Sequence, residues 1–204
     1  MKIYDGGRAP NPRRVQIFLK EKGLELPTQQ LDLNSLEHKT QKMTEKNPLQ
    51  TVPFLELDDG TVIAETVAIC RYLEELHPDP CLFGADPLER AMVEMWNRRV
   101  ELGFFFKVAQ SFRHLHPGAA VLEGEQIEAW GKKNQDLAMG FLPVLDQHFS
   151  TNRFFVGERF SVADITCIVA VQFFKPARLQ IPEEGLINFR RWLEEVLSRP
   201  SVQL

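Results

Sequence analysis

The sequence has few cysteines and no long hydrophobic run, and each absence excludes a class of protein. Its three cysteines, Cys70, Cys81 and Cys167, are far apart and form no Cys-x-x-Cys pair. This odd, scattered set argues against a disulfide framework and against a zinc site, and it fits a reducing compartment. The longest apolar stretch, residues 165–174, is interrupted by two polar residues and is too short to cross a bilayer. We therefore expect neither a bound metal nor a membrane span.

The chain also lacks an excess of basic residues. It carries 24 Lys and Arg against 28 Asp and Glu, a formal charge of −4. This balance argues against a nucleic-acid partner and against a polybasic membrane anchor. Residues 1–5 have neither the basic flank nor the apolar run of a secretory signal, so we expect a cytoplasmic protein. Hydrophobic residues make up 44% of the 204, which suffices for two small domains.

The first third of the chain alternates short strands with helices. Asn11 is predicted as the N-cap of the first helix, and Pro12 as its first helical residue. The pattern predicts, in order, a strand at 2–4, a helix ended by Gly23, a strand at 26–33, an irregular segment at 38–46, a hairpin at 52–64, and a helix that starts at 65 and stops before Pro78. This order predicts an α/β thioredoxin-like domain over residues 1–78.

Beyond the His-Pro-Asp-Pro sequence at 77–80 the pattern changes. Apolar residues recur at spacings of three and four, which predicts long amphipathic helices. The first is expected to end at residues 116–118, the second to cover 125–149, and two more to begin near Ser161 and Ile187. A strand pair is weakly indicated only at 154–156. These observations predict an all-α helical domain over residues 86–204.

Four segments together carry a family resemblance. Residues 9–15 open a helix after a strand and a turn, and residues 161–165 open another. The two most specific segments are Asn-Pro-Leu-Gln-Thr-Val-Pro-Phe-Leu at 47–55 and Glu-Thr-Val-Ala-Ile-Cys-Arg-Tyr-Leu at 65–73. In this order and spacing they resemble the cytosolic glutathione S-transferases over nearly the whole chain, and most of all theta-like and bacterial members. The resemblance implies glutathione as co-substrate, no metal, and a homodimer.

The resemblance implies two sites for the peptide part of glutathione. The bond between Val52 and Pro53 would be cis, and the backbone of Val52 would pair with the cysteinyl unit as an added strand. The alternative is an ordinary proline at the start of an edge strand. Glu65 and Thr66, at a helix start, would hold the γ-glutamyl ammonium and carboxylate groups. The alternative is that Thr66 only caps its own helix.

Three further residues match binding positions of the family. His38, and Lys39 beside it, would contact the glycine end of glutathione, although Thr51 stands where relatives often carry a lysine. Glu101 would reach the amine of glutathione in the neighbouring subunit. The alternative for His38 and Lys39 is a solvated surface. The alternative for Glu101 is an ordinary helical carboxylate, paired for example with Arg98.

The residue that activates the thiol departs from the commonest family pattern. Ala9 stands where theta-like relatives have a serine, and Tyr4 is expected to point into the fold. Asn11 is the best remaining side chain, because its amide can donate to sulfur at the helix start. The Pro10-Asn11 pair is similar to that of the nu-like bacterial class, whose members are mainly glutathione-dependent disulfide reductases. The alternative is that Asn11 serves only as an N-cap.

Two functions from different classes remain open. The first is an enzyme that activates the thiol of glutathione for conjugation to an electrophile or for reduction of disulfides or peroxides. Its second substrate would bind between the domains, with Phe104, Phe105, Phe112 and Arg113 as candidates. The second is a non-catalytic ligand carrier or protein-interaction module. The substitution at Ala9 favours the second function, whereas the intact Val-Pro and Glu-Thr motifs favour the first.

A structural motif accompanies these candidates. Ser161 and Asp164 fit a capping box in which Asp replaces the usual Glu, and Phe160 with Ile165 fits a hydrophobic staple around it. We expect this motif to start a helix of the second domain, and we assign it no chemistry.

Overall fold

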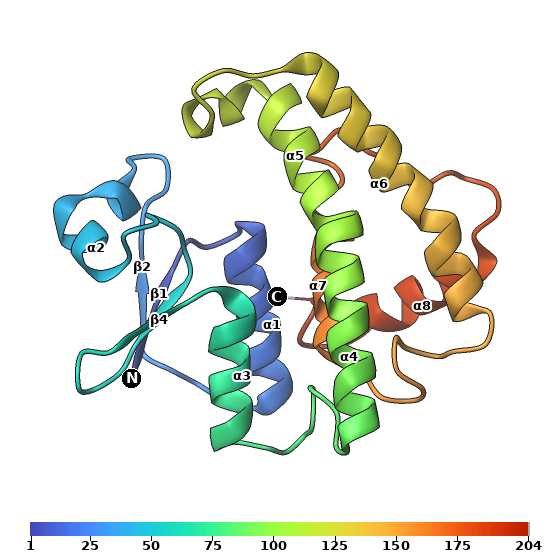
Figure 1. Cartoon of the computed structure of the whole chain (residues 1–204), viewed down its shortest axis with the longest axis horizontal. Coiled ribbons are helices and arrows are strands. Elements are labelled where there is room, and N and C mark those ends of the chain that lie inside the picture. Colours follow the sequence, from blue (N-terminus) through green and yellow to red (C-terminus); the bar gives the residue numbers. More distant parts are fainter. Residues whose placement is uncertain (204) are drawn as a thin grey trace. The chain divides into compact units, whose positions relative to one another are not determined.

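The computed structural model describes residues 1–203, and the chain divides between Cys81 and Leu82 into an N-terminal and a C-terminal unit (Figure 1). The N-terminal unit contains β1 (Lys2–Asp5), α1 (Pro10–Lys22), β2 (Thr28–Gln30), η1 (Glu37–Lys39), α2 (Gln41–Lys46), β3 (Phe54–Glu56), β4 (Val62–Ala64) and α3 (Thr66–Leu76). Its four strands form one sheet in the order β2-β1-β3-β4. Strand β1 runs parallel to β2 and antiparallel to β3, and β4 is antiparallel to β3. The predicted thioredoxin-like arrangement is confirmed.

The two faces of this sheet are covered by different helices. Tyr4 and Phe54 stack on one face, with ring centroids 4.4 Å apart, and pack with Leu31 and with Met43 of α2. Helices α1 and α3 pack against each other on the opposite side of the sheet (Figure 1). Side chains alternate between faces along a strand, so the neighbouring buried Ile3 points toward these helices.

Two predicted boundaries in this unit are wrong. The predicted strand 26–33 is only three residues long, because Asp32 turns the chain by accepting a hydrogen bond from the N–H of Asn34 over 2.9 Å. Helix α1 begins at Pro10, with Ala9 as its N-cap, so Asn11 already lies inside the helix. The predicted end is confirmed, since Gly23 adopts φ 64° and its N–H donates to the carbonyl of Lys20.

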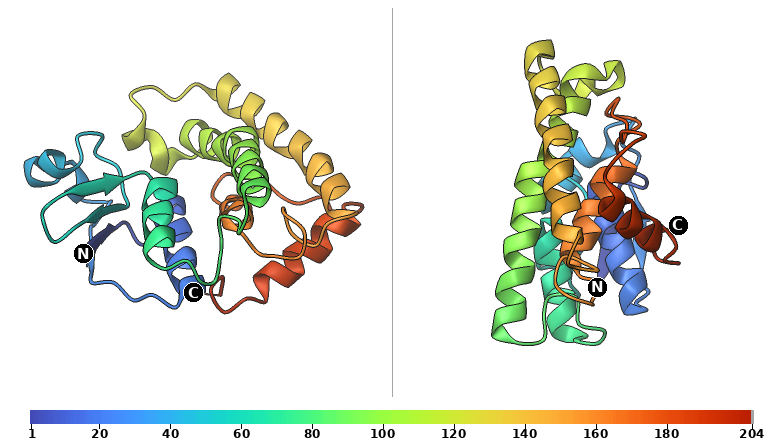
Figure 2. Two further views of the ribbon diagram at one scale, coloured as in Figure 1. Left: turned by 60° about the horizontal axis from the view of Figure 1, so that its bottom comes forward. Right: turned by 90° about the vertical axis from the view of Figure 1, so that its right-hand side faces the viewer.

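The described part of the C-terminal unit is helical. It contains α4 (Pro87–Val100), η2 (Glu101–Phe105), α5 (Phe106–Leu115), η3 (Pro117–Leu122), α6 (Glu128–Phe149), α7 (Val162–Gln172) and α8 (Ile187–Leu197). The predicted first long helix is continuous through α4, η2 and α5, but η2 is a π-helical turn. This long helix and α6 run alongside each other (Figure 2). The indicated strand pair at 154–156 is wrong, because only an isolated bridge joins Val156 to Arg159.

Helix α7 lies at the centre of this unit. All residues from Val162 to Ala170 are buried. The predicted capping box is confirmed: the Ser161 hydroxyl donates to Asp164 over 2.9 Å, and the Ser161 N–H donates to the same oxygen over 3.0 Å. The indole N–H of Trp192, from α8, donates to the other oxygen of Asp164 over 2.8 Å. None of the helices within residues 1–203 is long and apolar enough to span a membrane.

Candidate functional site

Three of the predicted binding segments meet at one end of the sheet. Tyr4 on β1 pairs with Phe54 on antiparallel β3, so the last residue of β1 and the first residue of β3 lie at the same end. Phe54 in turn pairs with Ala64 on β4. Continuing this register by one residue places Pro53 opposite Glu65. The strand order therefore brings together the start of α1, the segment before β3 and the start of α3.

A glycine contact joins the start of α1 to the segment before β3. A Cβ atom on Gly6 would lie 2.7 Å from Cγ2 of Val52, 2.9 Å from Cδ1 of Leu33 and 3.3 Å from Cγ of Pro12. Only glycine allows so close an approach of the backbone. The peptide bond between Val52 and Pro53 is cis, as predicted.

The first turn of α1 leaves one backbone donor free among the described residues. Pro10 and Pro12 have no N–H, and the N–H of Arg13 donates to the carbonyl of Ala9 over 3.1 Å. Asn11 is exposed, and neither its N–H nor its side-chain amide has a hydrogen-bond partner within residues 1–203. Both donors of Asn11 are therefore available to a ligand at this helix end.

The predicted N-cap role of Asn11 is wrong. The extended residue before the helix is Ala9, with φ −64° and ψ 148°, and it makes no side-chain capping bond. The fixed φ of Pro10 suits the first helical position, so the helix starts two residues earlier than predicted. Asn11 consequently has no capping bond to maintain, and the purely structural alternative for it falls away.

The start of α3 is also free of a side-chain cap. Glu65 precedes the helix with φ 69° and an exposed side chain, and within residues 1–203 it makes no side-chain capping bond. Thr66 is the first helical residue and is buried, so the alternative that it caps its own helix is wrong. The first N–H groups of a helix have no partner within the helix. This end of α3 can therefore bind a carboxylate.

His38 and Lys39 occupy the short helix η1 and differ in exposure. His38 is buried, with 7% of its surface exposed, and its Nδ1 has no hydrogen-bond partner among the described residues. Burial lowers the pKa of His38, and the charge of Lys39 lowers it further, so the ring is neutral at pH 7. The solvated-surface alternative is thus wrong for His38, whereas Lys39 is exposed. An unpaired buried nitrogen is rare and points to a missing partner.

Asn47, which was not among the residues predicted from sequence, shapes the segment before Val52. Asn47 is buried, and its side-chain amide donates to the backbone carbonyl of Thr51 over 2.9 Å and to its hydroxyl over 3.1 Å. The side-chain oxygen of Asn47 accepts the N–H of Leu49 over 3.3 Å. Asparagine before a proline is a common turn signal, so the pattern at Asn47-Pro48 gave a clue to this role.

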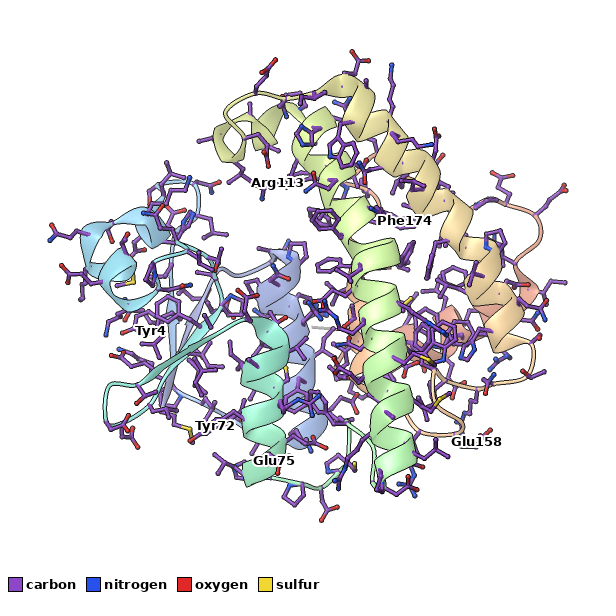
Figure 3. All side chains as sticks on the ribbon, in the orientation of Figure 1. Tyr4, Tyr72, Glu75, Arg113, Glu158 and Phe174 are labelled. Carbon is purple, nitrogen blue, oxygen red and sulfur yellow. The ribbon has the colours of Figure 1, made fainter. Side chains whose placement is uncertain are left out.

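The side chain of Tyr4 is directed away from the candidate site by its hydrogen bond to Glu56. Its side chain is buried, as predicted, and its hydroxyl donates to Oε2 of Glu56 over 2.6 Å (Figure 3). Glu56 also pairs with Lys46. The hydrogen bonds from Lys46 and Tyr4 hold the pKa of Glu56 below its ordinary value. The Tyr4 hydroxyl is therefore committed to a polar cluster on the sheet.

The remaining candidates belong to the C-terminal unit. Glu101 is the first residue of the π turn η2 and pairs with Arg98, with 2.6 Å between Oε2 and the guanidinium nitrogen. Phe104 and Phe105 are buried in the core. Arg113 pairs with Glu123, and its guanidinium also donates to the carbonyl of Leu122 (Figure 3).

Two of the three cysteines are excluded as reactive thiols by burial. Burial raises the pKa of Cys70 to about 12, and it raises the pKa of Cys167 well above the ordinary value. A thiol becomes a nucleophile as its thiolate, so both side chains are inert packing residues at neutral pH.

Comparison with known proteins places this chain in a family. Residues 9–76 match the sequence model of the glutathione S-transferase N-terminal domain, and residues 95–200 match that of the glutathione S-transferase C-terminal domain. The chain is 38% identical to glutathione S-transferase 2 of Saccharomyces cerevisiae, over 100% of this chain and 88% of the yeast protein.

Solved structures give the same result. A glutathione S-transferase domain-containing protein of Marinobacter aquaeolei superposes with a TM-score of 0.94 at 40% identity, covering 99% of this chain and 100% of that one. Gtt2 of Saccharomyces cerevisiae superposes with a TM-score of 0.93 at 38% identity, covering 100% of this chain and 99% of that one. The chain belongs to the glutathione S-transferase family.

Proposed function

We propose that the protein binds glutathione at this end of the sheet and activates its thiol, either for transfer to an electrophile or for reduction of a disulfide or peroxide. One observation carries the proposal. The strand register and the Gly6 contact support a site in which the start of α1, Val52 and the Glu65-Thr66 pair lie at the same end of the sheet. Glutathione needs these three things at once: a donor for its sulfur, a backbone edge, and a site for its charged γ-glutamyl end.

Each part of glutathione finds a matching group in the proposal. The N–H and C=O of Val52 pair with the cysteinyl unit. The carboxylate of the γ-glutamyl end accepts from Thr66 and the free N–H groups of α3, and the ammonium group donates to Glu65. The glycine carboxylate accepts from His38 and from Lys39. The unpartnered Nδ1 of His38 supports this assignment, because a carboxylate would satisfy it when this nitrogen carries the ring proton.

The thiol is activated at the start of α1. A free thiol of this type has a pKa near 8.5, and each unit of depression needs about 1.4 kcal/mol of preferential stabilisation of the thiolate. Among residues 1–203 the backbone N–H and side-chain amide of Asn11 have no hydrogen-bond partner, and the helix end adds a favourable field. Ala9 contributes no donor. The proton passes to solvent when the thiolate forms.

The activated sulfur supports either class of reaction. In conjugation it forms a bond to an electrophilic carbon, whose leaving group or π bond takes the electron pair. In disulfide reduction it bonds to one sulfur and releases the other as a thiolate, leaving a mixed disulfide that a second glutathione resolves. Family membership supports these enzymatic functions over a non-catalytic carrier.

We further propose a cytoplasmic homodimer with two functional domains. The glutathione-binding domain would span residues 1–78, and the helical domain, which contributes the second-substrate site, residues 86–204. The two matched family segments fall inside these limits. Exposed apolar side chains along α4 to α5 support self-association. In such a dimer Glu101 would reach the glutathione amine of the partner subunit.

Calorimetry with glutathione and a conjugation assay with an activated chloroarene test the function together. Binding with turnover, or with reduction of a mixed disulfide substrate, is the expected result. Binding without turnover toward either substrate class would indicate the carrier function instead. Absence of glutathione binding would contradict the proposal as a whole.

A further inference from the structure

A buried polar group lies behind the start of α1 and has no part in the function proposed above. Asp5, the last residue of β1, is only 3% exposed, and Gln16 lies in the second turn of α1. The side-chain amide of Gln16 donates to Oδ1 and Oδ2 of Asp5 over 3.2 and 3.0 Å, and to the carbonyl of Gly7 over 3.1 Å. Asp5 also accepts the N–H of Gly7. One carboxylate and one amide therefore hold both polar groups of the Gly7 backbone.

This contact fixes a turn that is otherwise hard to order. Gly6 and Gly7 are adjacent, and glycine loses more conformational freedom on folding than any other residue. Asp5 is itself fixed in the sheet, because its backbone carbonyl accepts the N–H of Leu31 over 2.8 Å. The hydrogen bond from Gly7 to the Asp5 side chain thus connects the turn to the sheet. The hydrogen bond from Gln16 to the Gly7 carbonyl connects the same turn to the helix. Gly6, which lies between Asp5 and Gly7, is in close contact with Val52.

We propose that Asp5 and Gln16 are positioning residues for thiolate stabilisation, which rests on the proposed function. They set the point at which α1 begins relative to Val52, and with it the position of the Asn11 donors. Hydrogen bonds weaken steeply with distance and angle, and a catalytic group must be held to within about 0.5 Å. Loss of the hydrogen bonds that join Asp5 and Gln16 to Gly7 will therefore weaken the hydrogen bond from Asn11 to the sulfur. It will weaken the binding of the rest of glutathione less.

Gln16→Met tests the proposal, since methionine has a similar length but no donor. The pKa of the bound thiol is read from the ultraviolet absorbance of the thiolate in the glutathione complex as pH is varied. We expect this pKa to rise by about one unit and kcat at neutral pH to fall severalfold, by about tenfold at most. The KM for glutathione should stay within about twofold, and kcat should recover at alkaline pH. A purely structural defect would give no such recovery.

Two further variants separate positioning from stability. Val15→Ala removes a buried side chain next to Gln16 on the same helix, so it lowers the melting temperature without touching the turn. It should leave the pKa of the bound thiol unchanged. Gln16→Asn keeps the amide on a shorter stem and should raise this pKa by less than Gln16→Met. Gln16→Asn replaces Gln16→Met in the pKa measurement if Gln16→Met does not fold.

The outcomes are distinct. An unchanged thiol pKa in the Gln16 variant that folds, or an equal rise in Val15→Ala, would overturn the positioning role while the proposed function stands. A wild-type protein that binds glutathione without lowering its thiol pKa would overturn the proposed activation at α1, and the positioning role with it.

Discussion

At the scale of single residues, the proposed role of Asn11 in activating the thiol can be tested directly. Asn11→Asp places a negative charge beside the sulfur and removes the amide donor, so it should raise the pKa of bound glutathione. Hydrogen bonds to charged groups contribute roughly 1.5–3 kcal/mol, which corresponds to about one to two pKa units. The fold should tolerate the change, because an acidic residue in the first turn of a helix is favourable. Thiolate absorbance and thermal unfolding measure the two effects.

Asn11→Ala is the matched control. It removes the side-chain donor and keeps the backbone N–H, so it should give a smaller rise in thiol pKa than Asn11→Asp. A fully active Asn11→Asp enzyme would contradict the role of this residue in activation. Thiolate stabilisation would then fall to the backbone N–H at the start of α1, which both variants keep.

Asn47 gives a second prediction at this scale. Asn47→Ala removes two hydrogen bonds to Thr51, each contributing about 1 kcal/mol, and so loosens the segment that carries Val52. We expect the KM for glutathione to rise roughly tenfold with a smaller change in kcat. Asn47→Asp keeps the acceptor for Leu49 but loses the donor, so it should raise KM to a similar extent. Steady-state kinetics check both, and an unchanged KM would refute the role.

The predictions made from sequence for single residues are confirmed where a motif determines the local geometry. The cis bond before Pro53, which the family resemblance implies, and the box of Ser161 with Asp164, which follows from its residue types and spacing, are both present. The predicted role of Asn11 as a cap is wrong, because both Pro10 and Pro12 suit the first helical position and the helix begins at Pro10. The Asp5–Gln16 contact joins positions eleven residues apart, and its geometry depends on a turn that the sequence leaves undetermined.

At the scale of secondary-structure elements, the start of α7 makes stability depend on pH. Burial raises the pKa of Asp164 to about 6, although Trp192, Ser161 and the N–H of Phe155 donate to it and partly oppose the rise. In the unfolded chain this pKa is about 3.9. The folded chain therefore binds more protons between these values. The contribution of Asp164 to stability is full below about pH 4 and is lost as pH rises through about 6, by about 3 kcal/mol.

Urea unfolding at a series of pH values measures this effect. Asp164→Asn has no ionisable group, so it should lack this part of the pH dependence. The variant should also be less stable throughout, because the amide nitrogen cannot accept from Ser161. The difference between the two proteins isolates Asp164 from other groups, including His148, whose pKa burial lowers. An identical pH dependence in both proteins would contradict the prediction.

Element order was predictable because hydrophobic period and turn residues agree along most of the chain. The lengths of the strands and the type of each helical turn were less predictable. The hairpin strands β3 and β4 are three residues each, shorter than the apolar pattern at 52–64. The π turn at Glu101–Phe105 is invisible to a helical period, because one extra residue in a turn leaves the apolar spacing nearly intact.

At the scale of the whole molecule, the exposed face of α4 to α5 predicts self-association. Leu88, Met92, Leu102 and Phe106 are 72%, 36%, 53% and 45% exposed. Leu88 and Met92 lie one turn apart on α4, and Leu102 and Phe106 lie one turn apart across η2 and the start of α5. An apolar stripe of this kind on a protein surface often marks an interface. We expect the protein to be a dimer at micromolar concentration by light scattering.

The double variant Leu88→Glu with Met92→Glu should dissociate this dimer. Each charged side chain removes an apolar contact from both subunits of a twofold assembly, so the dissociation constant should rise at least about hundredfold. The matched control is Leu137→Glu with Val144→Glu on α6, where the side chains are 40% and 49% exposed. The control should remain dimeric. Dissociation by the control alone would place the interface on α6.

The dissociated protein then tests whether Glu101 acts across the interface. In the dimer, Glu101→Gln should lower glutathione affinity by removing a charged partner for the amine of the neighbouring subunit's ligand. In the monomeric background the same change should have no further effect, because the contact it removes is already gone. Calorimetric titration of the four proteins completes the cycle. Equal losses in dimer and monomer would instead show that Glu101 acts within its own subunit, where it pairs with Arg98.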